Sequence, residues 1–342
     1  MRIFKRLFLF LAVNLLAAYA MGFVLTDPSI VKIYLEDIRK NEYDTLIIGT
    51  SHGETGFDPF LMSEELDAKV FNASRRLMPV IDQYYLLKTA NRKGTVKTVY
   101  YEIDPAYWNS TQPIKTHDDT CMLRHSSLVD RLEYTGRYLM SENYNYALFN
   151  YVFDMKTLKK APAILRSKLT LRSLPPDDRI RSIYEFLGIS KNFDYMGRGF
   201  RYGLEKDPQA DLTFEPLVFS AENVAPDTLY AFEDMVRYCR EEGIRLVCMI
   251  SALPEKRLLE ENHYAAHEYF EGLCKEQGVE FYDMNYLADG RLNRTPADYT
   301  DLDGHMMGDL ARRQTQLLIE IEKAEDRDSF FVRNLNAAAG AM

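Results

Sequence analysis

The hydrophobic pattern begins with one long apolar run near the N-terminus. The run extends over Leu7–Leu25, and Asn14 is its only strongly polar residue. A helix rises about 1.5 Å per residue, so a helix of this length just spans a hydrocarbon core of about 30 Å. Arg2, Lys5 and Arg6 precede the run. The positive-inside rule therefore predicts a single-pass helix with a cytoplasmic N-terminus and the rest of the chain outside.

The same run has two other interpretations. The tripeptide Ala18-Tyr19-Ala20 resembles a signal-peptidase site behind an apolar region, which would make the run a cleaved signal. A buried core helix is the third interpretation. Because apolar residues continue past the tripeptide to Leu25, we favour an uncleaved anchor formed by residues 1–27. Anchor and signal both predict an extracytoplasmic main domain.

Short apolar runs and amphipathic stretches alternate over much of the remaining chain. Five runs have the length and composition of buried strands: Tyr43–Gly49, Ala68–Ala73, Thr98–Asp104, Ile244–Ile250 and Val279–Asp283. Helical spacing characterises the stretches around them: Ser29–Lys40, part of Phe57–Leu66, Val80–Asn91, Ala225–Glu242, Glu261–Gln277 and Met306–Lys323. Strands that alternate with helices predict an α/β protein with a doubly wound parallel sheet.

The pattern changes between about residues 110 and 220. This stretch is rich in Tyr, Arg and Asn and has only weak helical periodicity, at residues 126–140 and 144–160. Pro175 and Pro176 interrupt it, and three glycines near its end predict a loop: Gly197, Gly199 and Gly203. We interpret the stretch as a helical cap inserted into the α/β domain.

The domain organisation follows from these changes in pattern. Residues 1–27 form the anchor, and residues 28–324 form one domain that contains the cap. Residues 325–342 are polar and then rich in Ala and Gly, which predicts a flexible tail.

Composition excludes one class of partner. The formal net charge is −9, whereas binding through a nucleic-acid backbone needs clustered Lys and Arg, so we expect no nucleic-acid partner. The four cysteines form no CxxC pair: Cys121, Cys239, Cys248 and Cys274. Buried free thiols are the favoured interpretation, and a disulfide remains open for an exported domain.

The first candidate for chemistry is the turn Gly49–Gly53 at the end of the first predicted strand. In open α/β sheets the ligand crevice lies at the carboxyl ends of the strands. Ser51 in this turn can present its hydroxyl to a substrate, and nearby backbone N–H groups can stabilise an oxyanion. A serine in a strand-to-helix turn is also a common N-cap, and that alternative stays open.

The second candidate is the segment Tyr299–Met306, just before the last predicted helix. A serine hydroxyl needs a neighbouring base, and that base needs an acid to orient it. His305 is a candidate base, and Asp301 and Asp303 precede it by four and two positions. Either carboxylate could orient the imidazole. The alternative interpretation of His305 alone is a solvated loop residue.

Together the two segments resemble those of the SGNH (GDSL-like) hydrolase superfamily. Gly49-Thr50-Ser51 is similar to the family's Gly-Asp-Ser block, with Thr in place of Asp. Asp301–His305 is similar to its Asp-x-x-His block, although Leu302 stands three residues before the histidine. The resemblance covers about residues 43–105 and 222–322. It implies a flavodoxin-like three-layer αβα sandwich, Ser51 as nucleophile and His305 as base.

The resemblance also implies an oxyanion hole built from the nucleophile's N–H, a Gly in a second block and an Asn in a third. The chain has Asn72-Ala73-Ser74 after the second strand and Asp104-Pro105 after the third, so the middle blocks diverge. The residues predicted to bind substrate or an oxyanion follow the first three strands: Gly49, Thr50, His52, Asn72, Ser74 and Asp104.

Other polar residues have competing interpretations. His52 could bind substrate or compete with His305 as the base. Arg75 and Arg76 could hold an anionic glycan or a phosphate, or could only solvate a loop. His263 and His267 lie one helical turn apart without an evident third ligand. We therefore expect neither a metal site nor a cofactor.

The divergent middle blocks and the anchor resemble those of membrane-anchored cell-envelope members of the superfamily, which act in polysaccharide O-acetylation or teichoic acid D-alanyl transfer. The predicted function is an extracytoplasmic serine esterase or O-acyltransferase that acts on acyl groups of envelope glycans. The alternative is a catalytically weak scaffold that binds envelope polysaccharide or a membrane-bound acyltransferase.

Overall fold

A computed structural model describes residues 2–25, 28–109, 126–138, 155–188, 191–211 and 215–332 of the chain. These residues divide into two compact units, which we describe separately. The first unit comprises Met1–Leu35 and Pro113–Ile183, and the second comprises Glu36–Gln112 and Tyr184–Met342. The division assigns residues 184–220 to the same unit as the sheet.

The first unit is helical in its described part. Its elements are α1 (Arg2–Leu25), the start of α2 (Ile30–Asn41), α7 (Leu128–Tyr138), α9 (Met155–Leu171) and most of α10 (Pro176–Leu187). Helix α1 is long and apolar enough over Ile3–Leu25 to cross a membrane, a test that a signal sequence also passes. Helix α9 packs on its end, where Lys168 donates to the Phe23 carbonyl over 2.6 Å.

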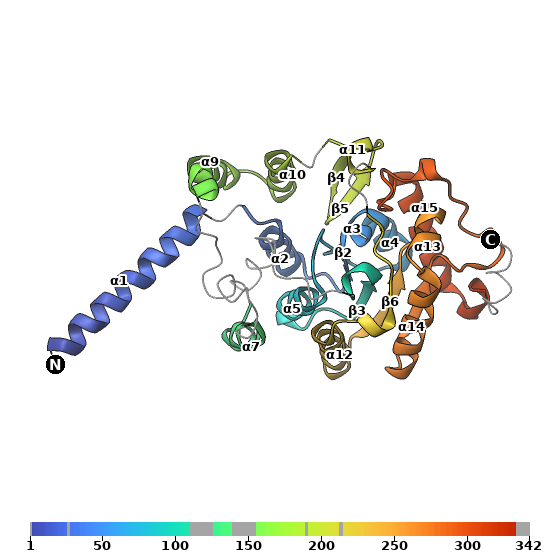
Figure 1. Cartoon of the computed structure of the whole chain (residues 1–342), viewed down its shortest axis with the longest axis horizontal. Helices are drawn as coiled ribbons and strands as arrows, with labels where there is room; N and C mark the ends of the chain where they lie inside the picture. The colour runs from blue at the N-terminus through green and yellow to red at the C-terminus, as the bar shows by residue number, and fades with distance from the viewer. Residues whose placement is uncertain are drawn as a thin grey trace. The chain divides into compact units, whose positions relative to one another are not determined.

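A five-stranded parallel sheet forms the centre of the second unit (Figure 1). Its strands are β1 (Thr45–Ile48), β2 (Val70–Asn72), β3 (Thr98–Glu102), β6 (Arg245–Ile250) and β7 (Glu280–Asp283). Their order is β2-β1-β3-β6-β7, which is the 2-1-3-4-5 order of flavodoxin-like doubly wound sheets. All five predicted strands are present, so the α/β class and the parallel sheet are confirmed.

Helices connect these strands. The α-helices of the second unit are α3 (Ser51–Gly56), α4 (Pro59–Leu66), α5 (Val80–Ala90), α11 (Pro208–Asp211), α12 (Pro226–Glu241), α13 (Glu255–Glu260), α14 (His263–Glu276) and α15 (Gly308–Lys323). Short 3₁₀ turns are η1 (Asn91–Lys93), η2 (Pro105–Tyr107), η3 (Ala221–Asn223), η4 (Ala288–Gly290), η5 (Pro296–Asp298) and η6 (Arg327–Phe330).

Neighbouring tyrosines of β3 show that both faces of the sheet are covered. Tyr100 belongs to a core that includes Leu310 and Leu318 of α15. Tyr101 points the other way, and its ring lies 6.0 Å from that of Phe232 in α12. Side chains alternate along a strand, so a strand buried on both faces reads as one continuous apolar run. This explains why the predicted strands lack a polar face.

The predicted glycine loop near residue 200 is wrong. The segment forms an antiparallel hairpin of β4 (Phe193–Gly197) and β5 (Phe200–Gly203). Its turn packs directly on the end of β2: Asn72 N donates to Arg198 O over 2.9 Å. An ideal Cβ on Gly199 would lie only 1.6 Å from the Asn72 carbonyl oxygen. These glycines mark a close backbone approach and a tight turn, which the sequence does not distinguish from a loop.

Four other expectations concern the middle of the chain and the cysteines. The periodicity at 126–140 corresponds to α7, and Pro176 begins α10 as its first residue. Part of the stretch at 144–160 lies outside the described residues, and residues 155–160 belong to α9. Three of the four cysteines are described, and all three are free and buried: Cys239, Cys248 and Cys274.

Candidate catalytic site

The turn after β1 places Ser51 at the first position of α3. Thr50 is the N-cap, and its hydroxyl accepts a hydrogen bond from the His52 N–H over 3.4 Å. The capping role considered for Ser51 therefore belongs to Thr50. The turn needs glycine at position 49, because an ideal Cβ there would lie only 2.6 Å from the Cβ of Glu102. Ser51 is 8% exposed and lines the pocket at this edge of the sheet.

The segment before α15 holds His305 against Asp301. An antiparallel bridge between Tyr299 and Met306 closes the segment into a loop. The Asp301 carboxylate lies 2.7 Å from His305 Nδ1 and also accepts from the His305 backbone N–H over 3.1 Å. Burial alone would raise the pKa of Asp301, but its contacts with His305 outweigh burial and lower that pKa. In this geometry Asp301 is the carboxylate that orients the imidazole.

Asp303 occupies a different position beside the same ring. Its carboxylate lies 3.8 Å from His305 Nε2, and its side chain is 43% exposed. Asp303 therefore approaches Nε2, the nitrogen that takes the proton in a catalytic triad, rather than Nδ1, which needs an orienting acid. Of the two carboxylates that the sequence left open, only Asp301 has a hydrogen bond to Nδ1.

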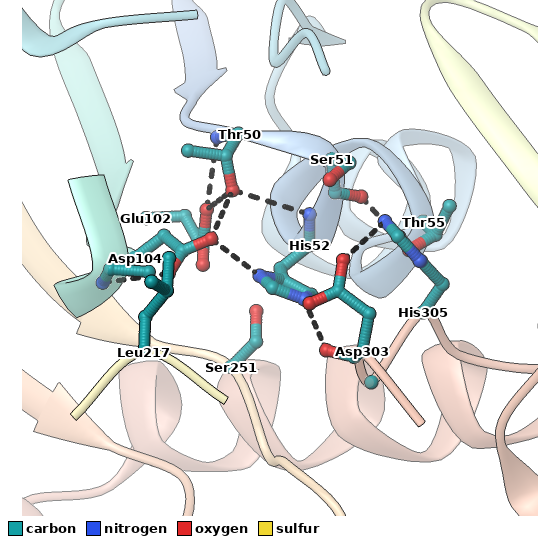
Figure 2. A network of polar contacts seen from close by, with 12 residues as sticks. Thr50, Ser51, His52, Thr55, Glu102, Asp104, Leu217, Ser251, Asp303 and His305 are labelled. Carbon is teal, nitrogen blue, oxygen red and sulfur yellow. Dashed lines mark hydrogen bonds and ion pairs between the residues drawn. The ribbon is translucent and has the colours of Figure 1, made fainter. Parts of the chain in front are cut away.

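Ser51 and His305 line the same pocket although they stand near opposite ends of the chain. In Figure 2 both residues lie beside His52, on whose ring the His305 ring stacks. Both line a pocket of about 720 Å³, together with Asp301 and Asp303. The loops that follow β1 and β7 thus reach one rim of the sheet, as expected for a doubly wound fold.

His52 lies behind the pair and is bound at both ring nitrogens. Its Nδ1 lies 2.9 Å from the Asp104 carboxylate, and its Nε2 lies 2.8 Å from the Asp303 carbonyl oxygen. Burial alone would lower the pKa of His52, but Asp104 outweighs burial and raises that pKa to about 9. A charged imidazolium has no lone pair to accept a proton, so the alternative of His52 as the base is not supported. Its ring stacks on that of His305 with centroids 5.2 Å apart.

A buried group of acids anchors His52 from the ends of β1 and β3. The Thr50 N–H donates to Glu102 over 3.0 Å, and the Thr50 hydroxyl lies 3.2 Å from Glu102 and 3.3 Å from Asp104. Burial raises the pKa of Glu102 to about 7 against the opposing charge of His52. Burial would also raise the pKa of Asp104, but His52 outweighs it and holds this pKa far below its usual range. Thr50 and Asp104 therefore support the site from behind rather than line the pocket.

Arg257 completes this support and was not predicted. It lies on α13 and donates to the Asp303 carbonyl oxygen, while its Nε donates to Glu261 over 2.6 Å. Its guanidinium also lies 3.4 Å from the Asp303 carboxylate. Burial would lower the pKa of Arg257, but Asp104 and Asp303 outweigh burial and raise it. No motif surrounds Arg257 in the sequence, so only the fold could reveal its contact with the loop of His305.

The predicted oxyanion role of Asn72 is not supported. Its amide donates to the carbonyls of Gly53 and Phe57 over 2.8 and 3.1 Å, so both hydrogens brace α3. Ser74 packs against Gly53, and its buried hydroxyl has no hydrogen-bond partner among the described residues. Gly49, Asn72 and Ser74 do not line the pocket. Among the predicted oxyanion donors, the N–H of Ser51 at the helix start remains.

A second unpredicted group surrounds Glu54, one turn after Ser51. Glu54 is fully buried and lies 2.8 Å from Arg75, 3.2 Å from Arg201 and 2.5 Å from the Tyr184 hydroxyl. Burial would raise the pKa of Glu54, but the two arginines outweigh it and lower that pKa. The carboxylate links α3 to the hairpin and to the end of β2. Arg75 is therefore an ion-pair partner in the interior rather than an exposed loop residue.

Two clusters of side chains contain a pair of histidines and a carboxylate, the residue types that bind metal ions. Ligand atoms of His52, Asp303 and His305 lie within 4.8 Å of one another. However, the Arg257 guanidinium lies 2.9 Å from His52 Nε2, so a cation there would meet an existing positive charge. His263 and His267 lie 3.3 and 2.9 Å from one carboxylate oxygen of Asp283, which they bracket in the interior. The charge of Arg257 therefore disfavours a metal ion at the first cluster.

Comparison with known proteins does not assign the chain to a family. No protein-family model matches it, and no curated protein matches its sequence. The function must therefore be inferred from the geometry around Ser51 and His305.

Proposed function

We propose that this protein is an extracytoplasmic serine esterase or O-acyltransferase of the SGNH-like type. The observation that carries the proposal is the arrangement of three side chains. Ser51 and His305 line the same pocket, and Asp301 binds Nδ1 of that imidazole. A hydroxyl, a base and an orienting carboxylate in this sequence form the minimal apparatus for acyl transfer through serine.

The reaction follows from the positions of these groups. As Ser51 Oγ attacks the acyl carbonyl, His305 Nε2 takes its proton, and Asp301 stabilises the imidazolium that forms. The tetrahedral intermediate then collapses, and His305 returns the proton to the departing alcohol. The acyl group remains on Ser51 until water or a glycan hydroxyl attacks it with His305 again as base. Water gives an esterase, and a hydroxyl acceptor gives a transferase.

Three features support the SGNH-like assignment without identifying a substrate. The strand order is 2-1-3-4-5, the nucleophile follows the first strand, and the base follows the last strand of the sheet. Helix α1 has the length and composition of a membrane span. An anchored protein with its pocket outside the cytoplasm would meet acylated glycans of the cell envelope, which we propose as its substrates.

One observation favours a second function. The amide of Asn72 is fully used within the fold, so the second block supplies no side-chain donor to an oxyanion. Loss of one such donor typically lowers kcat about 10²- to 10³-fold. The second candidate is therefore a catalytically weak scaffold that binds envelope polysaccharide or a membrane-bound acyltransferase.

Active-site labelling tests the proposal directly. The purified full-length protein is treated with a fluorescent fluorophosphonate, and turnover of p-nitrophenyl acetate is measured in parallel. We expect Ser51→Ala to abolish labelling and turnover and His305→Ala to reduce both steeply. Ser329→Ala changes an exposed serine outside the pocket and serves as the control. Equal signals from all four proteins would contradict the enzymatic proposal and favour the scaffold.

A further inference from the structure

Three arginines lie around one buried carboxylate, Glu54, and two of the three line the pocket: Arg76 and Arg201. Arg75 and Arg76 follow β2, and Arg201 lies on β5. Glu54 pairs with both Arg75 and Arg201. Arg76 lines the pocket but lies within hydrogen-bonding or ion-pair distance of no residue in the described parts of the chain. The pocket therefore contains one guanidinium whose donors are not used by the protein.

The environment of Arg76 makes this arrangement costly unless a ligand is bound. Burial lowers the pKa of Arg76, and the charges of Arg201 and Arg75 lower it further, while Glu54 opposes them. A partly desolvated cation without a partner is unfavourable, because neither water nor a counter-charge fully compensates it. The planar fork of a guanidinium matches the oxygens of a carboxylate or phosphate.

Four acidic residues line the pocket, and three of them belong to the loop of His305 or contact it. Asp301 is bonded to His305, and Asp303 contacts Arg257. Asp207 is tied to the segment before His305, since its N–H donates to the Thr300 carbonyl over 2.6 Å. Glu205, the fourth acid, is exposed. Arg76 lies near the group around Glu54, since the charges of Glu54, Arg201 and Arg75 act on it. An anion would bind beside Arg76.

We propose that Arg76 binds an anionic group, a carboxylate or a phosphate, on the substrate that Ser51 attacks. Lys191 also lines the pocket without a partner among the described residues and adds a second, exposed cation. The proposal deepens the proposed function by naming a substrate class, acyl esters on acidic rather than neutral carriers. The binding of the anion itself does not depend on catalysis.

A binding experiment tests the anion site independently of turnover. Full-length Ser51→Ala protein is titrated with glycerol 1-phosphate and with methyl glucuronoside, and the neutral controls are glycerol and methyl glucoside. We expect at least one anion to bind more tightly than its neutral control. Adding Arg76→Gln should weaken that binding about tenfold or more, because a charge-assisted hydrogen bond is lost. The stronger of the two anions distinguishes a phosphate carrier from a carboxylate carrier.

Two further variants keep the result interpretable. Arg76→Lys retains the charge but not the fork and should lose only part of the affinity, and it replaces Arg76→Gln if that variant does not fold. Arg237→Gln removes an arginine outside the pocket and should leave binding unchanged. Equal binding of charged and neutral probes, or affinity unaffected by both Arg76 changes, would overturn the proposal.

The two proposals fail in different ways. If fluorophosphonate labelling is independent of Ser51 but anion binding requires Arg76, the enzymatic function is wrong and the anion site stands. If labelling requires Ser51 but binding ignores Arg76, the enzyme stands and its substrate is not selected by charge at this position.

Discussion

At the scale of single residues, the carboxylates of Asp301 and Asp303 both lie near the His305 ring, and their distances to its two nitrogens indicate different roles. Asp301 lies 2.7 Å from His305 Nδ1, whereas Asp303 lies 3.8 Å from Nε2. The contacts that hold Asp303 in the interior are made mainly by its backbone carbonyl, which His52 and Arg257 approach. Its carboxylate contributes little to the geometry of the imidazole.

The first prediction compares the two isosteric changes. Asp301→Asn should lower kcat for p-nitrophenyl acetate by about 10³-fold or more, because an amide favours the wrong tautomer of His305. Asp303→Asn should lower it less than about tenfold, because the carbonyl contacts remain. Steady-state kinetics of both variants check this. A larger loss in Asp303→Asn than in Asp301→Asn would show that the assignment of the two acids is reversed.

The second prediction concerns the pH dependence of stability. The pKa of His52 is raised from 6.5 to about 9 in the folded protein. A raised pKa contributes stability that is fully present below pH 6.5 and is lost as the pH rises through 9. At 1.4 kcal/mol per pKa unit, the contribution is about 3 kcal/mol. The groups that face His52 are Asp104, Arg257, Asp303 and His305.

Chemical unfolding at several pH values measures this contribution. Between pH 7 and 9 the free energy of unfolding should fall in the wild type and remain flatter in His52→Gln. Glu102, whose pKa is raised to about 7, loses its own contribution at lower pH and does not mimic the effect in this window. Parallel curves for the two proteins above pH 7 would show that His52 is not charged in the folded state.

At the scale of elements, the hairpin β4–β5 supplies residues that line the pocket at the edge of the sheet. Arg201 on β5 binds Glu54 of α3, and Phe193 on β4 lines the pocket beside His305, with ring centroids 6.3 Å apart. The turn fits only because Gly199 presses against the backbone of Asn72. The hairpin thus depends on a glycine for its position as well as for its conformation.

The third prediction distinguishes the two reasons for a glycine: a positive φ and the lack of space for a Cβ. Gly199 and Gly243 both have a positive φ, at +80° and +68°, but only Gly199 has neighbours within 4 Å of an added Cβ. Gly243→Ala should cost about 1 kcal/mol of stability from backbone strain alone. Gly199→Ala should cost about 3 kcal/mol or more, because the carbonyl of Asn72 must also move. Equal losses in thermal unfolding would mean that the hairpin turn does not pack on β2.

At the scale of the whole molecule, α1 differs from the α/β unit in the side chains that it exposes. The large side chains of α1 are mostly exposed, including Phe8 at 75% and Leu15 at 71%. Such a surface is unfavourable in water, at about 25 cal/mol for each Å² of apolar area. A lipid bilayer would cover it, so we propose that α1 is an uncleaved anchor.

The fourth prediction tests that proposal with the full chain. After expression and cell lysis, the protein should remain in the membrane pellet through a carbonate wash, and its N-terminal peptide should be found intact by mass spectrometry. The single-pass orientation predicts that a cysteine introduced on the α/β unit is labelled by an impermeant thiol reagent in intact cells with a permeable outer layer. A mature N-terminus near Ala20 would instead identify the run as a cleaved signal.

The sequence by itself predicts the strands of the sheet, because each strand is indicated by a short run of neighbouring apolar residues. Five short apolar runs predicted the five strands, since a strand buried on both faces needs apolar residues at every position. Because Ser51 follows the first predicted strand and His305 follows the last, the sequence predicts that both lie at one rim of the sheet. Strand order and handedness in α/β folds are constrained enough for that step.

Tertiary structure alone decided the rest. The sequence spacing does not show whether Asp301 or Asp303 orients His305. The closed loop before α15 brings the Asp301 carboxylate to His305 Nδ1. Arg257 and Glu54 bind partners far away in the chain, for which no periodic pattern exists. The hairpin at Gly199 was missed because a glycine needed for close packing looks the same as a glycine in a loop. Local composition determines elements, whereas pairing between distant charges depends on how those elements pack.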